Sequence, residues 1–348
     1  MDNPLAVDIS QDSNLSVPCC TVLDVTTTTV FENPVLNDVF RGSEARAAGI
    51  VTKAQLQGPR FRRLFQDVYV AADVPVTHEL RCRGAALVVP EDAVLTGRSA
   101  ATVMGVELAK PYDPVEFVVP EASRFGPKQG MHVRRTEVKK TESRRWNGIR
   151  IAKPSRVALD LLLRLSPRTR GWVRRLRIGV PDLDAFLRFK RIRRRTLDKM
   201  FHRRRNRGIR LARTALNLAD TRAESHPESE LRVVMHFGGI KAVPQLTVRR
   251  GRRRIARLDL AIEPEKVAVE YDGRWHNAPR QARLDDLRRR QLFAQGWQFV
   301  VVTAEDLAGD YTTLLGKIQA GIGRARTRGQ GVSMGDRTAR VWSARAAS

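Results

Sequence analysis

Acidic residues in the segment 255–272, IARLDLAIEPEKVAVEYD, stand at a spacing that could bind a metal ion. Apolar and polar residues alternate on both sides of a short polar turn, which predicts a β-hairpin. If Ile262 pairs with Val267, counting back along both strands places Asp259 directly opposite Glu270. Like charges about 5 Å apart destabilise a strand pair, so this arrangement requires a compensating positive charge.

Two sources of that positive charge are consistent with the hairpin. Mg²⁺ binds one or two carboxylates together with phosphate oxygens and waters, so a divalent cation would bridge the pair. Alternatively, Arg257, opposite Asp272 in this register, and other arginines neutralise an ordinary exposed face. A register shift of two residues would keep both faces but separate the carboxylates. The buried face is expected to contain Leu258, Leu260, Ile262, Val267, Val269 and Tyr271.

The chain as a whole is strongly basic. Its 348 residues include 63 Lys and Arg against 37 Asp and Glu, which gives a net charge of +26 and a pI of 11.2. This balance is typical of a nucleic-acid binder, and we expect DNA as the partner, with RNA as the alternative. Membrane association is not expected, because no apolar run approaches the roughly 20 residues that span a bilayer.

Neither the amino terminus nor the cysteines indicate export. The first residues include acids and lack a basic region followed by an apolar core, unlike a secretory signal. The three cysteines, two of them adjacent, support neither a disulfide framework nor a zinc site. We therefore expect a cytoplasmic, nucleoid-associated protein, and the sequence leaves its oligomeric state open.

A dense basic run lies between Arg188 and Arg213, where 13 Arg and Lys residues stand against one acid, Asp198. Charges of one sign repel strongly unless a polyanion neutralises them, which favours phosphate contact over a merely solvated helix face. Such contacts supply affinity without reading base sequence. The predicted phosphate contacts are Arg193, Arg194, Arg195, Arg203, Arg204 and Arg205.

The chain is long enough for two or three domains, and its patterns predict an α/β multi-domain protein. Residues 36–75 show a helix from Ser43, a break at Gly49, a second helix from Thr52 and a strand ending at Val70, the outline of a winged helix-turn-helix. The predicted segments are a loosely ordered leader (1–35), this helix-turn-helix-like module (36–75), an α/β structural module (76–165), a basic helical connector (166–221), a compact final domain (222–323) and a basic tail (324–348).

The final domain has a predicted element order of αβββαβα. Helix patterns cover about 227–237 and 280–295, and a last helix begins near Asp306. Strand patterns cover about 243–248 and 298–303, in addition to the hairpin.

This order, with Glu228 on the first helix, Asp259 on the second strand and Glu270 on the third, resembles the PD-(D/E)XK nuclease superfamily, whose fold is restriction-endonuclease-like. More narrowly, the chain resembles the family called domain of unknown function 559, which is related to very-short-patch-repair endonucleases. The motifs that carry this resemblance cover about residues 222–308: Glu228-Ser229, Leu231-Arg232, Pro244-Gln245, Leu258-Asp259, Val269-Glu270-Tyr271-Asp272-Gly273 with His276, Asp285 with Arg288, and Gly296-Trp297.

Upstream motifs resemble a leading module that accompanies this domain in actinobacterial proteins and is similar to abortive-infection antitoxin regions. They are Phe40-Arg41-Gly42-Ser43, Asp67-Val68-Tyr69-Val70 and Pro154 to Asp160 in KPSRVALD.

The resemblance implies metal-assisted phosphodiester hydrolysis, in which a cation polarises a phosphoryl oxygen and lowers the pKa of a bound water. The implied ligands of Mg²⁺ or Mn²⁺ are Asp259, Glu270 and Asp272. Glu228 and His276 are the implied further catalytic residues.

Several of these residues have an alternative role in the structure. Glu228 follows Ser225 at the spacing of a helix capping box. His276 could be an ordinary loop residue, and Gln245 either touches substrate or is simply polar on an exposed strand. Arg288 either pairs with an acid one turn away or reaches a phosphate.

One departure from the superfamily concerns its catalytic lysine, which would fall two residues after Glu270, where this chain has Asp272. An acid at this position is usual in the narrower family. Lys266, expected on the same strand face as Glu270, could partly substitute.

These features together predict a DNA-binding, Mg²⁺-dependent endonuclease-like phosphodiesterase. The alternative is a non-catalytic DNA-binding regulator or antitoxin-like protein whose nuclease domain is degenerate.

Overall fold

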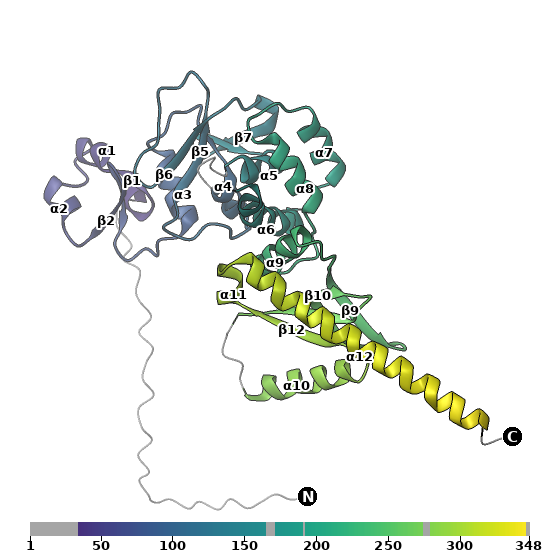
Figure 1. Ribbon diagram of the computed structural model, residues 1–348. Coiled ribbons are helices and arrows are strands. Elements are labelled where there is room, and N and C mark those ends of the chain that lie inside the picture. The colour runs from purple at the N-terminus through teal and green to yellow at the C-terminus, as the bar shows by residue number, and fades with distance from the viewer. Residues whose placement is uncertain (1–33, 165–170, 191, 274–278, 346–348) are drawn as a thin grey trace, which may run out of the picture.

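The computed structural model describes residues 34–164, 171–190, 192–273 and 279–345. It is a mixed α/β structure with three sheets among these residues (Figure 1). Most of the predicted leader and His276 lie outside the described residues. No helix in the described part of the chain is long and apolar enough to cross a membrane.

The amino-terminal module is a small sheet with two short helices. A 3₁₀ turn, η1 (Pro34–Asn37), leads into β1 (Phe40–Arg41), α1 (Gly42–Ala47), α2 (Lys53–Gln57), β2 (Phe61–Phe65) and β3 (Val68–Ala71). The strands lie in the order β1-β3-β2, and both pairings are antiparallel. The predicted sequence of helix, turn, helix and strand is present, and β2 is an additional strand that makes a hairpin with β3.

Two upstream motifs interlock in this module. Phe40 pairs with Tyr69 across β1 and β3, and the Asp67 carboxylate accepts hydrogen bonds from Ser43 N–H (2.8 Å) and Ser43 Oγ. A Cβ on Gly42 would lie 2.6 Å from the Tyr69 ring, so only glycine permits this approach. These contacts fix the β2–β3 turn against the start of α1.

The middle module contains a five-stranded sheet in the order β6-β5-β4-β8-β7. The β4–β8 and β5–β6 pairs are parallel, whereas β4–β5 and β7–β8 are antiparallel. Its elements are α3 (His78–Ala86), β4 (Val94–Leu95), α4 (Gly97–Val103), β5 (Val115–Val119), β6 (Met131–Arg135), η2 (Lys140–Glu142), β7 (Ser143–Trp146), β8 (Ile149–Ala152) and α5 (Pro154–Leu163).

The KPSRVALD motif forms the start of α5 and places two charges in the core. Arg156 is fully buried and donates from Nε to Asp160, 2.8 Å away, and Thr96 also donates to Asp160 (2.7 Å). Buried charges are tolerated only when paired in this way. The motif therefore has a structural role in the middle module.

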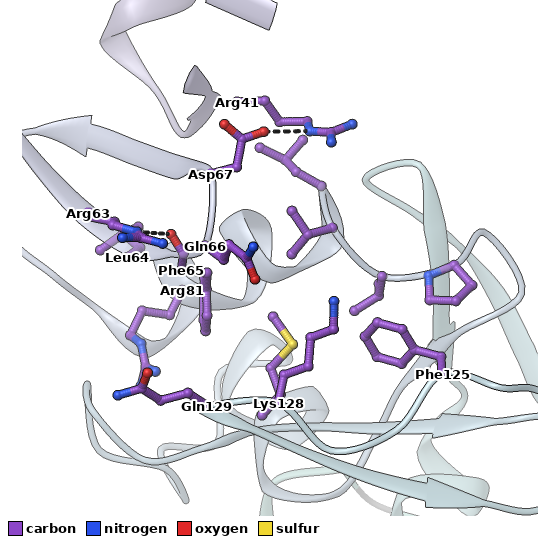
Figure 2. A pocket seen from close by; sticks show the side chains of 16 residues that line it. Arg41, Arg63, Leu64, Phe65, Gln66, Asp67, Arg81, Phe125, Lys128 and Gln129 are labelled. Carbon is purple, nitrogen blue, oxygen red and sulfur yellow. Dashed lines mark hydrogen bonds and ion pairs between the residues drawn. The ribbon is translucent and has the colours of Figure 1, made fainter. Parts of the chain in front are cut away.

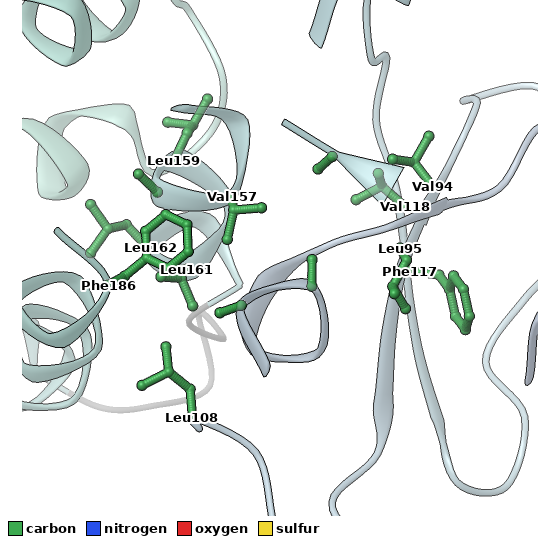
Figure 3. Close-up of a cluster of buried hydrophobic side chains, with 14 of the residues drawn as sticks. Val94, Leu95, Leu108, Phe117, Val118, Val157, Leu159, Leu161, Leu162 and Phe186 are labelled. Atoms are coloured by element: carbon green, nitrogen blue, oxygen red, sulfur yellow. The ribbon is translucent and has the colours of Figure 1, made fainter. Parts of the chain in front are cut away.

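Three helices follow: α6 (Trp172–Lys190), α7 (Arg194–His202) and α8 (Ile209–Leu218). Their apolar residues, such as Phe186 and Phe201, join the same hydrophobic core as the middle sheet and α5. Figure 3 shows Phe186 beside Leu161 and Leu162 of α5. The segment predicted as a basic connector thus shares one core with the middle module.

The final domain contains α9 (His226–Phe237), β9 (Val243–Arg250), β10 (Arg253–Ile262), β11 (Val267–Asp272), α10 (Pro279–Phe293), β12 (Gln298–Thr303), α11 (Ala304–Ala308) and α12 (Tyr311–Arg345). Its sheet order is β12-β11-β10-β9, with β11–β12 parallel and the other pairs antiparallel. The predicted element order is present, with the short α11 added before the long last helix.

Helices cover both faces of this sheet (Figure 1). On one face, Leu260 and Ile262 pack with residues of α9 and α12; on the other, Leu258 packs with Leu292 of α10. The prediction that Leu258 shares a face with Leu260 and Ile262 was wrong. The alternation is interrupted beside Gln245 on β9, whose backbone has a left-handed φ of 55°.

A pair of glycine substitutions in α12 tests the docking of this helix on the sheet. A Cβ on Gly321 would lie 2.3 Å from Val300 of β12, whereas one on Gly316 would meet nothing within 4 Å. We expect Gly321→Ala to destabilise the protein by about 1–3 kcal/mol through overpacking. Gly316→Ala should instead stabilise it by up to about 1 kcal/mol, because alanine favours helix. Urea unfolding measures both, and effects of equal sign would contradict the docking.

Candidate functional site

Three carboxylates from three elements of the final domain come together. Glu228 lies in the first turn of α9, Asp259 on β10 and Glu270 on β11. The predicted register is confirmed, because Ile262 pairs with Val267 and Leu260 with Val269. The paired residues end at Leu260 and Val269, and Asp259, the next residue back along β10, is close enough to Glu228 and Glu270 for their charges to act on it.

The negative charges of Glu228 and Glu270 act on the carboxyl group of Asp259. Burial and the negative charges of Glu228 and Glu270 together raise the pKa of Asp259 to about 6. A hydrogen bond from the Tyr271 backbone and the charge of Arg288 oppose this rise. This combination of burial and nearby like charges is typical of functional sites. The site therefore holds excess negative charge when Asp259 ionises.

Glu228 lies beside the helix cap and is a member of this group. Ser225 is the N-cap of α9: its Oγ accepts from the Glu228 backbone and donates to Glu228 Oε1 (2.8 Å), which is one half of the predicted capping box. Oε2 accepts from the Glu224 backbone (3.0 Å) and from Gln245 Nε2 (2.7 Å). The buried carboxylate is thus held in place on both oxygens, and Gln245 acts as its positioning residue.

Arginines of α10 supply positive charge to Glu270. Arg288 donates to Glu270 Oε1, and Arg289 Nη2 lies 3.5 Å from Oε2. A guanidinium therefore compensates this carboxylate in the structure. Arg257, the arginine named for this role from sequence, pairs with Glu224 instead.

Asp272 is the last residue of β11 and is exposed, in contrast to the buried Glu270. In the described part of the chain, no three His, Cys, Asp or Glu side chains are arranged to hold a metal ion. The donor types nevertheless suit Mg²⁺ or Mn²⁺, because the carboxylates of Asp259 and Glu270 offer hard oxygens.

The arginines of the basic run divide into two groups. Arg204 pairs with Glu142 of η2 and is largely shielded, so its guanidinium already has a partner within the fold. Arg194 donates to Asn217 (3.1 Å) yet stays half exposed. Solvent-exposed side chains are found at Arg193, Arg195, Arg203 and Arg205.

Helix α6 anchors the helix that bears Glu228, a role that the sequence analysis missed. Asp182 of α6 is fully buried and lies 2.8 Å from Arg98 and 3.1 Å from His226, and it also pairs with Arg164. Burial raises the pKa of Asp182, but the hydrogen bond from His226 and the charges of Arg164 and Arg98 outweigh it and hold the pKa at about 2.

A second buried acid of α6, Asp184, binds the same region of α9. It accepts from Ser229 Oγ (2.7 Å), from Arg232 Nη2 (2.6 Å) and from the Asp220 backbone (2.7 Å). Burial raises the pKa of Asp184 to about 6 despite the charge of Arg232. The sequence signal was two acids beside Pro181 within a basic region.

Arg177 completes this junction. It donates to Glu230 of α9 and to the Leu307 carbonyl (2.6 Å), and its guanidinium lies 4.0 Å from the centre of the Tyr311 ring. Contacts from α6 therefore flank Glu228 on both sides along α9. The middle module sets the position of a residue in the final domain's site.

Comparisons with known proteins identify relatives of part of the chain. No family model matches, and no solved structure matches. Two uncharacterized proteins from two strains of Mycobacterium tuberculosis are each 33% identical over 155 residues, which is 43% of this chain. The chain covers 57% of the length of each of these relatives.

The raised pKa of Asp259 predicts an unusual effect of pH. Its stabilising contribution is present below about pH 4 and is lost as pH rises through about 6, because the folded pKa exceeds the unfolded value of 3.8. Asp259→Asn should therefore be more stable than the parent protein at pH 8, by about 1–3 kcal/mol, and should converge with it near pH 4. Thermal unfolding in EDTA across this range provides the measurement. Asp286→Asn, an exposed control on α10, should show no such trend.

The junction at α6 predicts a large loss of stability in Asp182→Asn. Replacing the buried carboxylate removes the charged partner that Arg98 and Arg164 share, although Arg164 keeps Glu116, 3.7 Å away; the loss should cost about 3 kcal/mol at pH 7. Hydrogen exchange should also rise in the first turn of α9, where His226 loses its acceptor. Asp198→Asn on α7, a half-exposed control, should change stability by less than about 0.5 kcal/mol. Equal effects of the two substitutions would contradict the anchoring role.

Proposed function

We propose that this protein is a DNA-binding, divalent-metal-dependent phosphodiesterase, similar to an endonuclease, with a restriction-endonuclease-like final domain. The observation that carries the proposal is the convergence of Glu228, Asp259 and Glu270 from three elements in a partly buried group. Packing like charges together lowers the stability of a fold, and proteins retain such destabilising arrangements mainly at functional sites. The αβββαβα order and the mixed sheet support the fold assignment.

Asp259 and Glu270 would hold Mg²⁺ or Mn²⁺, with Asp272 at the end of β11 as a third ligand. When bound, the cation would polarise a phosphoryl oxygen and lower the pKa of a coordinated water. Glu228, fixed by Ser225 and Gln245, keeps a carboxylate at the edge of this group.

Arg288 has two uses in this proposal. While it pairs with Glu270, it neutralises the carboxylate and holds α10 against the sheet. On arrival of a nucleic acid, its guanidinium is placed to move to a phosphate, whose oxygens a guanidinium can bind in a bidentate manner. The exposed arginines of α7 and the loop after it would add sequence-independent phosphate contacts.

The helix-turn-helix-like outline of the amino-terminal module and the net charge of +26 support DNA as partner, with RNA as the alternative. We place the protein in the cytoplasm with the nucleoid. Its oligomeric state is not part of the proposal.

A second candidate function is a non-catalytic DNA-binding regulator or antitoxin-like protein. The ion pair between Arg288 and Glu270 favours it, because this guanidinium occupies an oxygen that a metal would need. Asp272, in the position of the superfamily's lysine, favours it as well.

A plasmid-nicking assay with Mg²⁺ or Mn²⁺ separates the two candidates. We expect the parent protein to nick DNA and the variants Asp259→Ala and Glu270→Ala to lose at least about 100-fold in rate, since each removes a metal ligand. Binding of the same DNA in EDTA should remain. Asp286→Ala, which removes an exposed acid of α10, is the matched control and should nick normally.

Calorimetric titration of Mn²⁺ into Arg288→Ala gives an independent reading. Removing the competing guanidinium should tighten Mn²⁺ binding while slowing nicking. Saturable DNA binding with no nicking and no metal binding, in either protein, would exclude the nuclease and favour the regulator.

A further inference from the structure

A large groove separates the amino-terminal module from the middle module, far along the chain from the carboxylate site. Its volume is about 1220 Å³, above the roughly 300–1,000 Å³ typical of small-molecule sites. One wall is the β2–β3 turn with Arg41, and the other is the loop 125–131 before β6. Figure 2 shows Lys128 extending into the opening between these walls.

The groove is positively charged. Four basic side chains line it against one acid, Asp67, whose carboxylate is already bound by Ser43 and Arg41. Backbone carbonyls hold two of the cations, Arg63 and Arg81, and the charge of Asp113 also acts on Arg81. The four basic residues are Arg41, Arg63, Arg81 and Lys128.

Two of these cations illustrate the point. Arg81 donates to the carbonyls of Pro111 (3.0 Å) and Asp113 (2.7 Å), and Arg63 donates from Nε to the Phe65 carbonyl (3.1 Å). A carbonyl fixes a guanidinium without cancelling its charge. The rest of the exposed Arg63 guanidinium is available to a ligand.

Aromatic rings and amides accompany the charges. Lys128 Nζ lies 5.1 Å from the centre of the half-buried Phe125 ring, and Arg81 lies at the same distance from Phe65. Exposed amides at Gln66 and Gln129 come from the two facing walls. Rings beside cations are the combination that binds the bases and phosphates of unpaired nucleic-acid strands.

The walls of the groove are fixed before any ligand arrives. The Asp67–Ser43 hydrogen bonds hold the β2–β3 turn, whose Asp67 has a left-handed φ of 62°. At the floor, a Cβ on Gly130 would lie 2.8 Å from Arg81 and 3.2 Å from the Phe65 ring, so the loop packs closely there. A preformed groove avoids the entropy of ordering on binding.

We propose that this groove binds a single-stranded segment of DNA, with phosphates on Arg63 and Lys128 and an unpaired base against Phe125. A duplex keeps the faces of its bases stacked on one another, so only an unstacked base can use this ring. The inference rests on the proposed DNA-binding function, but it is independent of the carboxylate site. The proposed substrate therefore has a single-stranded portion, which the groove holds away from the carboxylate site.

Fluorescence anisotropy of the full chain in EDTA tests the proposal without cleavage. The probes are a labelled 20-nucleotide single strand, the duplex of the same sequence and the matching single-stranded RNA, each over a series of salt concentrations. We expect the single strand of DNA to bind at least about tenfold more tightly than the duplex.

Substitutions locate this binding. Phe125→Leu should weaken single-strand binding by about 5- to 150-fold through lost stacking, with little effect on the duplex. Lys128→Gln and Arg63→Gln should each reduce the slope of log K against log salt by about 0.7, as expected for one phosphate contact of a single strand. Arg145→Gln, a highly exposed arginine of β7, is the matched control and should leave both unchanged.

The outcomes separate this inference from the nuclease proposal. Unchanged single-strand affinity in Lys128→Gln and Arg63→Gln would overturn it, and because both side chains are exposed, these variants test it even if Phe125→Leu fails to fold. A preference for the duplex or for RNA would also overturn it. Nicking by the parent protein and its loss in Asp259→Ala report on the carboxylate site alone, whichever way the groove experiment ends.

Discussion

Two buried aspartates of α6 constrain the rest of the structure. Asp182 and Asp184 lie in the interior, where an unpaired carboxylate would cost several kcal/mol, so each must find positive or hydrogen-bonding partners. Those partners come from the middle module, through Arg98 and Arg164, and from α9, through His226, Ser229 and Arg232. Satisfying the charges therefore joins the final domain to the middle module. Because these bonds involve three positions of α9, His226, Ser229 and Arg232, they also fix the turn of α9 that carries Glu228.

The carboxylate group depends on that anchoring. Glu228 repels Asp259 and Glu270, so α9 would move away from them if it were not anchored. The raised pKa of Asp259 shows that this repulsion persists in the folded protein. Arg288 reduces it from the other side of the sheet by pairing with Glu270. The arrangement is consistent with a functional site that lowers the stability of the fold, since the protein with Asn at position 259 is expected to be more stable than the protein with Asp. The groove beside Lys128 lies in a separate part of the chain.

Much of the final domain was predictable from sequence because its signals are local. The pairing of Ile262 with Val267 follows from alternation about a short turn, and the helix start at Ser225 follows from capping chemistry. The expected sharing of one face by Leu258 and Leu260 failed, because the two side chains pack in different hydrophobic clusters, with α9 and α12 for Leu260 and with α10 for Leu258. The basic run was treated as uniform, although Arg204 is held by Glu142 and the apolar residues between its arginines enter the core.

The sequence by itself determined the order of elements, the hairpin register and the closeness of Asp259 to Glu270, because each depends on residues near one another in the chain. Only the tertiary structure decided which donors meet which acids: Arg288 for Glu270, the Gln245 amide for Glu228, and His226 for Asp182 across 44 residues. With 63 Lys and Arg residues in the chain, local spacing cannot select one partner. The packing of α6, α9 and α10 decides which side chains come within hydrogen-bonding distance of one another. Burial of these side chains makes an incorrect pairing costly in free energy.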